Sequence, residues 1–146
     1  RLRLGMWVMI REGSIRRDLK EIITRVLVHK TYIDRLMFCS DGVDPLDIEH
    51  YGHIDHCVRE AISNGVDAVD AFSMASKNCF DYYNMGKDLG GIAPGKLADI
   101  LVFDGLFSIK PKKVFVGGKL VVSNGSIVSK IKNKTIPSWI KKTVKI

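Results

Sequence analysis

The chain has 146 residues, 46% hydrophobic and 27% charged with four prolines, a composition typical of a folded globular protein that excludes a disordered or collagen-like chain. No apolar run approaches the roughly 18 residues of a membrane-spanning helix and the start lacks a signal peptide, so we expect a cytoplasmic protein without a membrane partner. Six lysines after residue 129 supply most of the net charge of +7, but one aromatic residue accompanies them, which argues against a nucleic-acid partner.

The first predicted unit is a strand followed by a helix. Residues 5–10 form an unbroken apolar run, which is typical of a parallel strand covered on both faces. A polar corner follows at residues 11–14. Ser14 is placed to cap a helix, because apolar residues recur at helical spacing from Leu19 onward.

A second unit repeats this pattern. Residues 36–39 form another short apolar run, which stops at the polar corner 40–42. Asp44 as N-cap and Pro45 at the first helical position predict a short helix to about Ile48. Two strand–helix units in succession are typical of a parallel sheet or a (β/α) barrel, so the predicted fold class is α/β.

Two further helices are predicted before the pattern changes. The first covers 54–64, and the second runs from its cap Asp67 to Asn78 with Val69 and Phe72 on its inner face. After residue 90 the chain reads as short strands at 98–103, 113–116 and 120–122. The pair Gly117-Gly118 is a hairpin signal between the last two.

The remaining segment, 130–146, contains Pro137 and Trp139 but has no sustained periodicity. We interpret it as a basic linker or the start of an additional domain. The chain also lacks an initiator methionine, and we expect both of its ends to be cuts. Cys39, Cys57 and Cys79 are odd in number and widely spaced, which predicts reduced thiols rather than disulfides or a metal knuckle.

Each predicted strand delivers one carboxylate just after its last apolar residue. Reactive groups of parallel α/β folds gather at the carboxyl ends of strands, which makes Asp41 and Glu12 the candidates. For Asp41 the alternative is a turn residue, although Asp44 already serves as the cap. For Glu12 the alternative is a favourable charge near a helix N-terminus.

Other chemistries have weaker support. His53 and His56 have helical spacing, but no zincin glutamate or third ligand accompanies them. The sequence contains no phosphate-binding loop, no Gly-x-Ser-x-Gly and no zinc-deaminase signature. If Asp41 binds a metal, the other ligands must lie upstream of Arg1.

Several stretches together resemble a known family. Residues 91–102, Gly-Ile-Ala-Pro-Gly-Lys-Leu-Ala-Asp-Ile-Leu-Val, look like the segment with which amidohydrolase-superfamily chains leave their barrel for a small β-sandwich. Residues 9–14, 39–42 with Pro45, 52–55 and 74–78 closely resemble the adenine deaminase family within that superfamily. The resemblance implies the last strands and helices of a (β/α)8 barrel in 1–90 and part of a β-sandwich in 91–129.

The resemblance also implies an activity and a set of roles. The whole enzyme would deaminate adenine, its small-molecule substrate, to hypoxanthine and ammonia with water activated by a divalent metal, in a binuclear manganese or iron site or with zinc. Asp41 would be the metal ligand of the eighth strand and the catalytic proton carrier. Glu12, Arg11 and Ser14 would line the purine pocket.

The full-length protein would be a homo-oligomer, and this part alone would be inactive. Two alternatives stay open. One is another metal-dependent amidohydrolase that acts on a cyclic amide or a different aminopurine, and the other is a non-catalytic fragment that serves as an interaction module.

Overall fold

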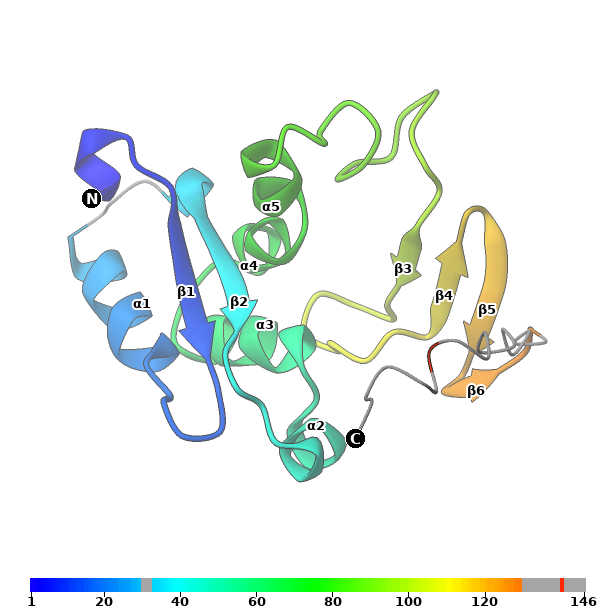
Figure 1. Ribbon diagram of the computed structural model, residues 1–146, viewed down its shortest axis with the longest axis horizontal. Helices are drawn as coiled ribbons and strands as arrows, with labels where there is room; N and C mark the ends of the chain where they lie inside the picture. The colour runs from blue at the N-terminus through cyan, green and yellow to red at the C-terminus, as the bar shows by residue number, and fades with distance from the viewer. Residues whose placement is uncertain (30–32, 130–139, 141–146) are drawn as a thin grey trace.

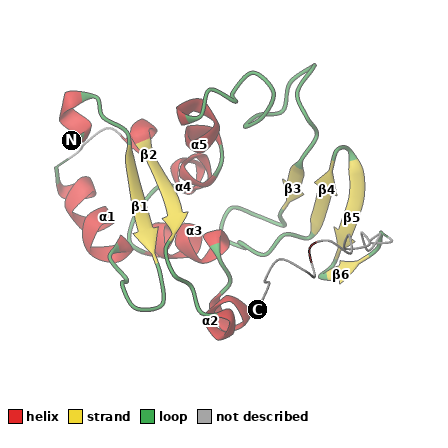
Figure 2. Ribbon diagram, in the orientation of Figure 1, coloured by secondary structure: helices red, strands yellow, loops and turns green. Residues whose placement is uncertain are grey.

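The computed structural model describes residues 1–29, 33–129 and 140. Apart from Ile140, the predicted linker 130–146 lies outside the described residues. Figure 1 shows a strand pair flanked by helices, with a second, four-stranded sheet beside it. Figure 2 gives the same view coloured by secondary structure.

The strand pair consists of β1 (Val8–Glu12) and β2 (Leu36–Ser40), which run parallel with Val8 opposite Leu36. This confirms the predicted parallel arrangement. The first strand begins and ends later than predicted, because the segment before it forms a 3-10 helix, Leu2–Leu4, and because Arg11 and Glu12 pair with residues of β2.

The helix α1 (Leu19–Val28) covers this pair, but it does not begin at Ser14 as predicted. Its N-cap residue, Asp18, makes no side-chain capping bond. The Glu12 carboxylate instead accepts the backbone N–H of Leu19 at 3.2 Å, which satisfies one of the free donors at the helix start. The first turn of the helix is thereby tied to the end of β1.

The predicted start of α2 (Pro45–Tyr51) is confirmed, and α2 is longer than predicted. The Asp44 side chain accepts the N–H of Leu46 at 2.8 Å, as an N-cap residue does. The helix α3 (Ile54–Ser63) also follows the prediction closely and contributes buried residues to the core. That core joins β1, β2, α1, α3 and α4, and Ile109 reaches it from the loop before β4.

The single helix predicted to Asn78 is two helices, α4 (Ala68–Ala75) and α5 (Lys77–Tyr82). Ser76 breaks the helix, with φ −139° and ψ −87°, and its hydroxyl donates to the carbonyl of Phe72. The predicted inner face was right for Phe72, which packs against the core, and wrong for Val69, which is 59% exposed. The buried residues are Ala68, Ala71 and Met74, whose small members let α4 approach α3 closely.

The second sheet has four antiparallel strands in the order β3 (Ile100–Val102), β4 (Lys113–Val116), β5 (Lys119–Ser123) and β6 (Ser126–Ile127). The hairpin predicted at Gly117-Gly118 is confirmed, and both residues have positive φ, which the tight turn requires. Because β6 has only two residues, it carried no recognisable signal in the sequence. No helix in the described part of the chain is long and apolar enough to cross a membrane.

Candidate active site

Asp41 and Arg11 meet beyond the end of the strand pair. Arg11 donates from Nη1 to Asp41 Oδ2 at 2.9 Å and also forms an ion pair with Asp18 at 3.4 Å. The Asp41 side chain is 51% exposed. It lies directly after β2, and its backbone N–H donates to the carbonyl of Glu12 at 3.2 Å, so the pairing of the strands continues to this residue.

The pleat of the strands separates Arg11 from Glu12. Successive side chains of a strand point to opposite faces. Ile10 and Phe38, which are opposite each other in the register, are buried in the core beneath the helices, and Glu12 shares their face. Arg11 and Asp41 belong to the other face, together with Met9, which is 41% exposed.

Glu12 is therefore a buried carboxylate on the helix side of the sheet. Its exposed fraction is 9%, and its bond from Leu19 is part of that buried environment. Burial raises the pKa of the Glu12 carboxyl, while the bond from the Leu19 backbone offsets part of this effect. The electrostatic effect of His56 and Arg17 acts in the same direction as the Leu19 bond.

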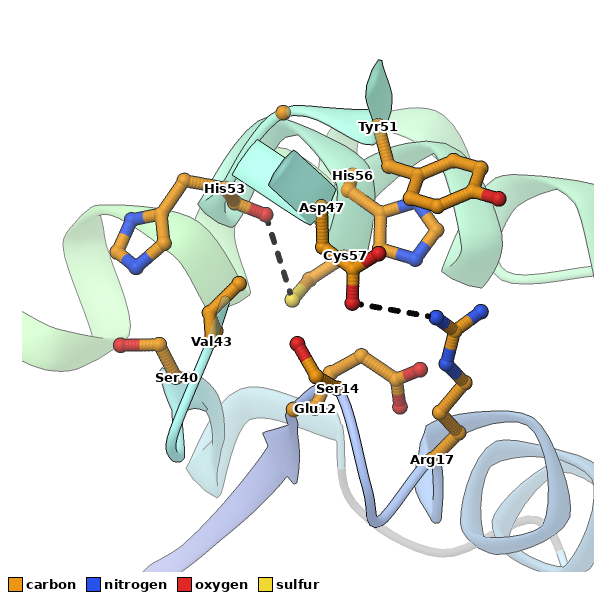
Figure 3. Close-up of a pocket in the computed structure, with 12 residues that line it drawn as sticks. Glu12, Ser14, Arg17, Ser40, Val43, Asp47, Tyr51, His53, His56 and Cys57 are labelled. Atoms are coloured by element: carbon orange, nitrogen blue, oxygen red, sulfur yellow. Dashed lines mark hydrogen bonds and ion pairs between the residues drawn. The ribbon is translucent and has the colours of Figure 1, made fainter. Parts of the chain in front are cut away.

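A small pocket opens on this helix side. Figure 3 shows Glu12 and Ser14 facing Asp47, His56 and Cys57 across it. Its cavity volume is about 20 Å³, which suits one water molecule and is far below the roughly 300 Å³ of ligand pockets. A purine does not fit this space as it stands. Asp41 and Arg11 are not among its lining residues.

Ser14, the third predicted substrate residue, also has a local partner. Its hydroxyl accepts the backbone N–H of Asp44 at 2.7 Å, and its own N–H donates to the carbonyl of Gly42 at 3.3 Å. The structure thus brings Arg11 to Asp41 and places Glu12 and Ser14 at the separate pocket. A role in binding substrate stays a prediction for all three.

The cysteines and histidines add no second reactive centre to the described residues. Cys39, Cys57 and Cys79 are free thiols, and burial raises the pKa of Cys57 to about 12. His53 and His56 lie at the pocket, but within the part of the chain that the structure describes no three metal-binding side chains gather.

The chemistry of Asp41 fits a single metal ligand. A carboxylate that follows a strand directly and is half exposed offers an oxygen ligand of the kind divalent cations use. The described residues do not complete such a site by themselves. Any further ligands would come from outside these residues.

Sequence reasoning missed two features of the site. The first is that Glu12 is inside β1, where the alternation of side chains between the two faces turns it away from Asp41. This alternation could have predicted the separation if the strand had been extended to Glu12. The second is the close approach between the turn at Gly13 and the backbone of Asp41. A Gly-Ser pair after a strand gave no sign of which distant segment it contacts.

Comparison with known proteins shows the family to which the chain belongs. The sequence pattern of the amidohydrolase family matches residues 13–121, which is most of the chain. The chain belongs to the amidohydrolase family. The fold is therefore the last strands and helices of an amidohydrolase (β/α)8 barrel followed by part of a small β-sandwich, as the family resemblance implied.

Two curated relatives of the chain are named adenine deaminases. The chain is 58% identical over 146 residues to an adenine deaminase of Cenarchaeum symbiosum, and 36% identical to one of Desulforamulus reducens. Each match covers 100% of this chain but only 24% and 25% of the relative, respectively. The chain thus spans about a quarter of the length of the curated relatives it matches.

A solved structure supports the fold. A β-aspartyl dipeptidase of Fervidobacterium islandicum superposes with a TM-score of 0.68, covering 90% of this chain and 37% of the dipeptidase. The sequence identity is 14%, so this likeness bears on architecture and not on substrate.

Proposed function

We propose that the chain is part of an enzyme that hydrolyses adenine to hypoxanthine and ammonia. The observation that carries the proposal is the position of Asp41, a half-exposed carboxylate directly after β2 and paired with Arg11. Relatives named adenine deaminase that match along the whole chain favour adenine over the alternative substrates. Residues 1–90 would belong to the barrel and 91–129 to the β-sandwich.

Membership of the amidohydrolase family implies a divalent metal. When bound, the metal would supply a Lewis acid that makes water a better nucleophile near neutral pH. Asp41 would be one of its ligands and would move a proton from the attacking water to the departing amine, as a positioned carboxylate can. Arg11 would hold the Asp41 carboxylate in orientation and fix its distance from the strand end.

We propose different roles for the three predicted substrate residues, Arg11, Glu12 and Ser14. Arg11 shares the face of Asp41, which supports a direct contact between Arg11 and the substrate for this one of the three residues. Glu12 ties α1 to β1, and Ser14 ties the loop after β2 to the turn after β1. Their influence on purine binding would be indirect.

The test is ammonia release from adenine by the full-length protein with Asp41→Asn. Loss of the carboxylate should lower kcat by at least about 10²-fold, because the amide cannot carry the proton. Asp104→Asn is the matched control, since Asp104 is an exposed aspartate that is paired with Lys112 at 2.8 Å in the loop between β3 and β4. Near-normal turnover of Asp41→Asn would contradict the assigned role.

A binuclear manganese or iron site, zinc as its alternative, a homo-oligomeric full-length protein and a cytoplasmic location stay predictions. Elemental analysis of the purified protein would identify the metal. Sedimentation velocity would give the oligomeric state.

A further inference from the structure

The turn that follows β1 lies unusually close to the backbone of Asp41. A Cβ atom at Gly13 would be 1.8 Å from the carbonyl oxygen of Asp41 and 2.9 Å from its carbonyl carbon. The backbone of Gly13 is not in the left-handed region, so the reason for glycine here is space and not φ. Both contacted atoms belong to the main chain, so no side-chain rotation can relieve the overlap.

The same turn also holds the loop 41–44 by hydrogen bonds. Asp41 N–H donates to the carbonyl of Glu12, and Ser14 N–H donates to the carbonyl of Gly42. The Ser14 hydroxyl accepts the N–H of Asp44 at 2.7 Å. Hydrogen bonds to Glu12 and Ser14, the residues on either side of Gly13, therefore hold three of the four loop residues.

The far end of the loop is fixed as well. Asp44 is the N-cap of α2, and its side chain is used for the N–H of Leu46. Arg17, three residues after Ser14, forms an ion pair with Asp47 of α2 at 3.4 Å. The segment after β1 thus contacts both the loop and the helix that follows it, which leaves the Asp41 backbone little freedom to move.

We propose that Gly13 and Ser14 are positioning residues for Asp41, which set where its carboxylate lies by fixing the backbone of the loop 41–44. This inference rests on the function proposed for Asp41. Neither residue needs to touch the substrate. Gly13 acts by allowing close approach, and Ser14 acts through its hydroxyl.

The first test is Gly13→Ala in the full-length protein. A Cβ needs more than 3 Å from the nearest backbone atom, so either the turn or the Asp41 peptide must shift by an ångström or more. A displacement of about 1 Å is expected to lower kcat by about 10²-fold while changing KM for adenine much less. Gly105→Ala is the matched control, because a Cβ at Gly105 meets nothing within 4 Å.

The second test uses Ser14→Ala and Ser14→Thr. It tests the positioning role even if Gly13→Ala fails to fold. Loss of the hydroxyl should weaken metal affinity or kcat by about 10- to 100-fold, the range seen for residues that orient a metal ligand, and threonine should restore it. Amide hydrogen exchange at residues 41–44 should be faster in Ser14→Ala and normal in Ser14→Thr.

The outcomes separate the two proposals. If the unsubstituted protein does not deaminate adenine, the proposed function fails, and metal affinity and amide exchange still test the positioning role. Normal kcat in a folded Gly13→Ala variant, or unchanged exchange at 41–44 in Ser14→Ala, would overturn it. Selective loss of kcat with faster exchange, rescued by threonine, would support it.

Discussion

Arg11 and Glu12 are neighbours in the chain with opposite environments. Arg11 reaches a half-exposed carboxylate, whereas Glu12 is buried against the start of α1. An exposed ion pair is worth little to stability, so the Arg11–Asp41 contact is better suited to orient a carboxylate than to hold the fold together. A buried carboxylate, in contrast, makes stability depend on pH.

Glu12→Gln should change the pH dependence of stability. Burial raises the pKa of Glu12 above 4.5, so the folded state favours the protonated form. The contribution of Glu12 to stability is therefore full below pH 4.5 and is lost as pH rises through the raised pKa. Glutamine can still accept the Leu19 N–H without a charge, so the variant should gain in stability relative to the unsubstituted protein as pH rises through that window.

Thermal unfolding of both proteins at pH 4 and pH 7 measures this effect. Glu21→Gln is the control, because Glu21 is an exposed glutamate of α1 in an ion pair with Arg25. A difference between wild-type and Glu12→Gln that does not change with pH would contradict the argument from burial.

At the scale of elements, Asn78 joins α5 to β2. Its side chain is 3% exposed and donates to the carbonyls of Leu36 at 2.8 Å and Ile33 at 3.3 Å. These bonds fix the start of β2, and therefore the register that brings Asp41 to the end of β1.

Asn78→Ala should destabilise the protein by about 1–3 kcal/mol, since it leaves buried carbonyls without a donor. Ser73→Ala is the comparison, because Ser73 makes a local bond to Val69 within α4 and its loss should cost less than about 0.5 kcal/mol. Urea unfolding of both variants gives the difference. Equal destabilisation by the two substitutions would show that the Asn78 bonds between α5 and β2 contribute no more than the local Ser73 bond within α4.

The local order of elements could be predicted where the signal is local. Asp44 with Pro45 gave the start of α2, and Gly117-Gly118 gave the hairpin, because capping and turn chemistry depend on adjacent residues. The start of α1 could not be predicted in this way. The Glu12 carboxylate, seven residues earlier, accepts the backbone N–H of Leu19. The start of α1 is therefore set by a residue of β1 and not by a cap at Ser14.

At the scale of the whole molecule, the candidate site was predictable only in part. The apolar run before Asp41 identified a strand end. The family match supports the fold, and the role of the Asp41 carboxylate stays a proposal. The partners of Asp41 depend on the parallel register of β1 and β2, which pairs residues 28 positions apart in the sequence. The pattern of apolar and polar residues in one segment cannot predict the register between two strands.

Residues 1–146 expressed alone should release no ammonia from adenine above the enzyme-free rate, even with added manganese or iron. In the described part of the chain β1 and β2 form a two-stranded sheet, and no three metal-binding side chains gather there. One carboxylate cannot hold a catalytic metal, and two parallel strands cannot close a barrel. Full-length protein assayed in parallel is the positive control, and steady turnover by the isolated chain would refute the view that Asp41 is one ligand of a site completed elsewhere.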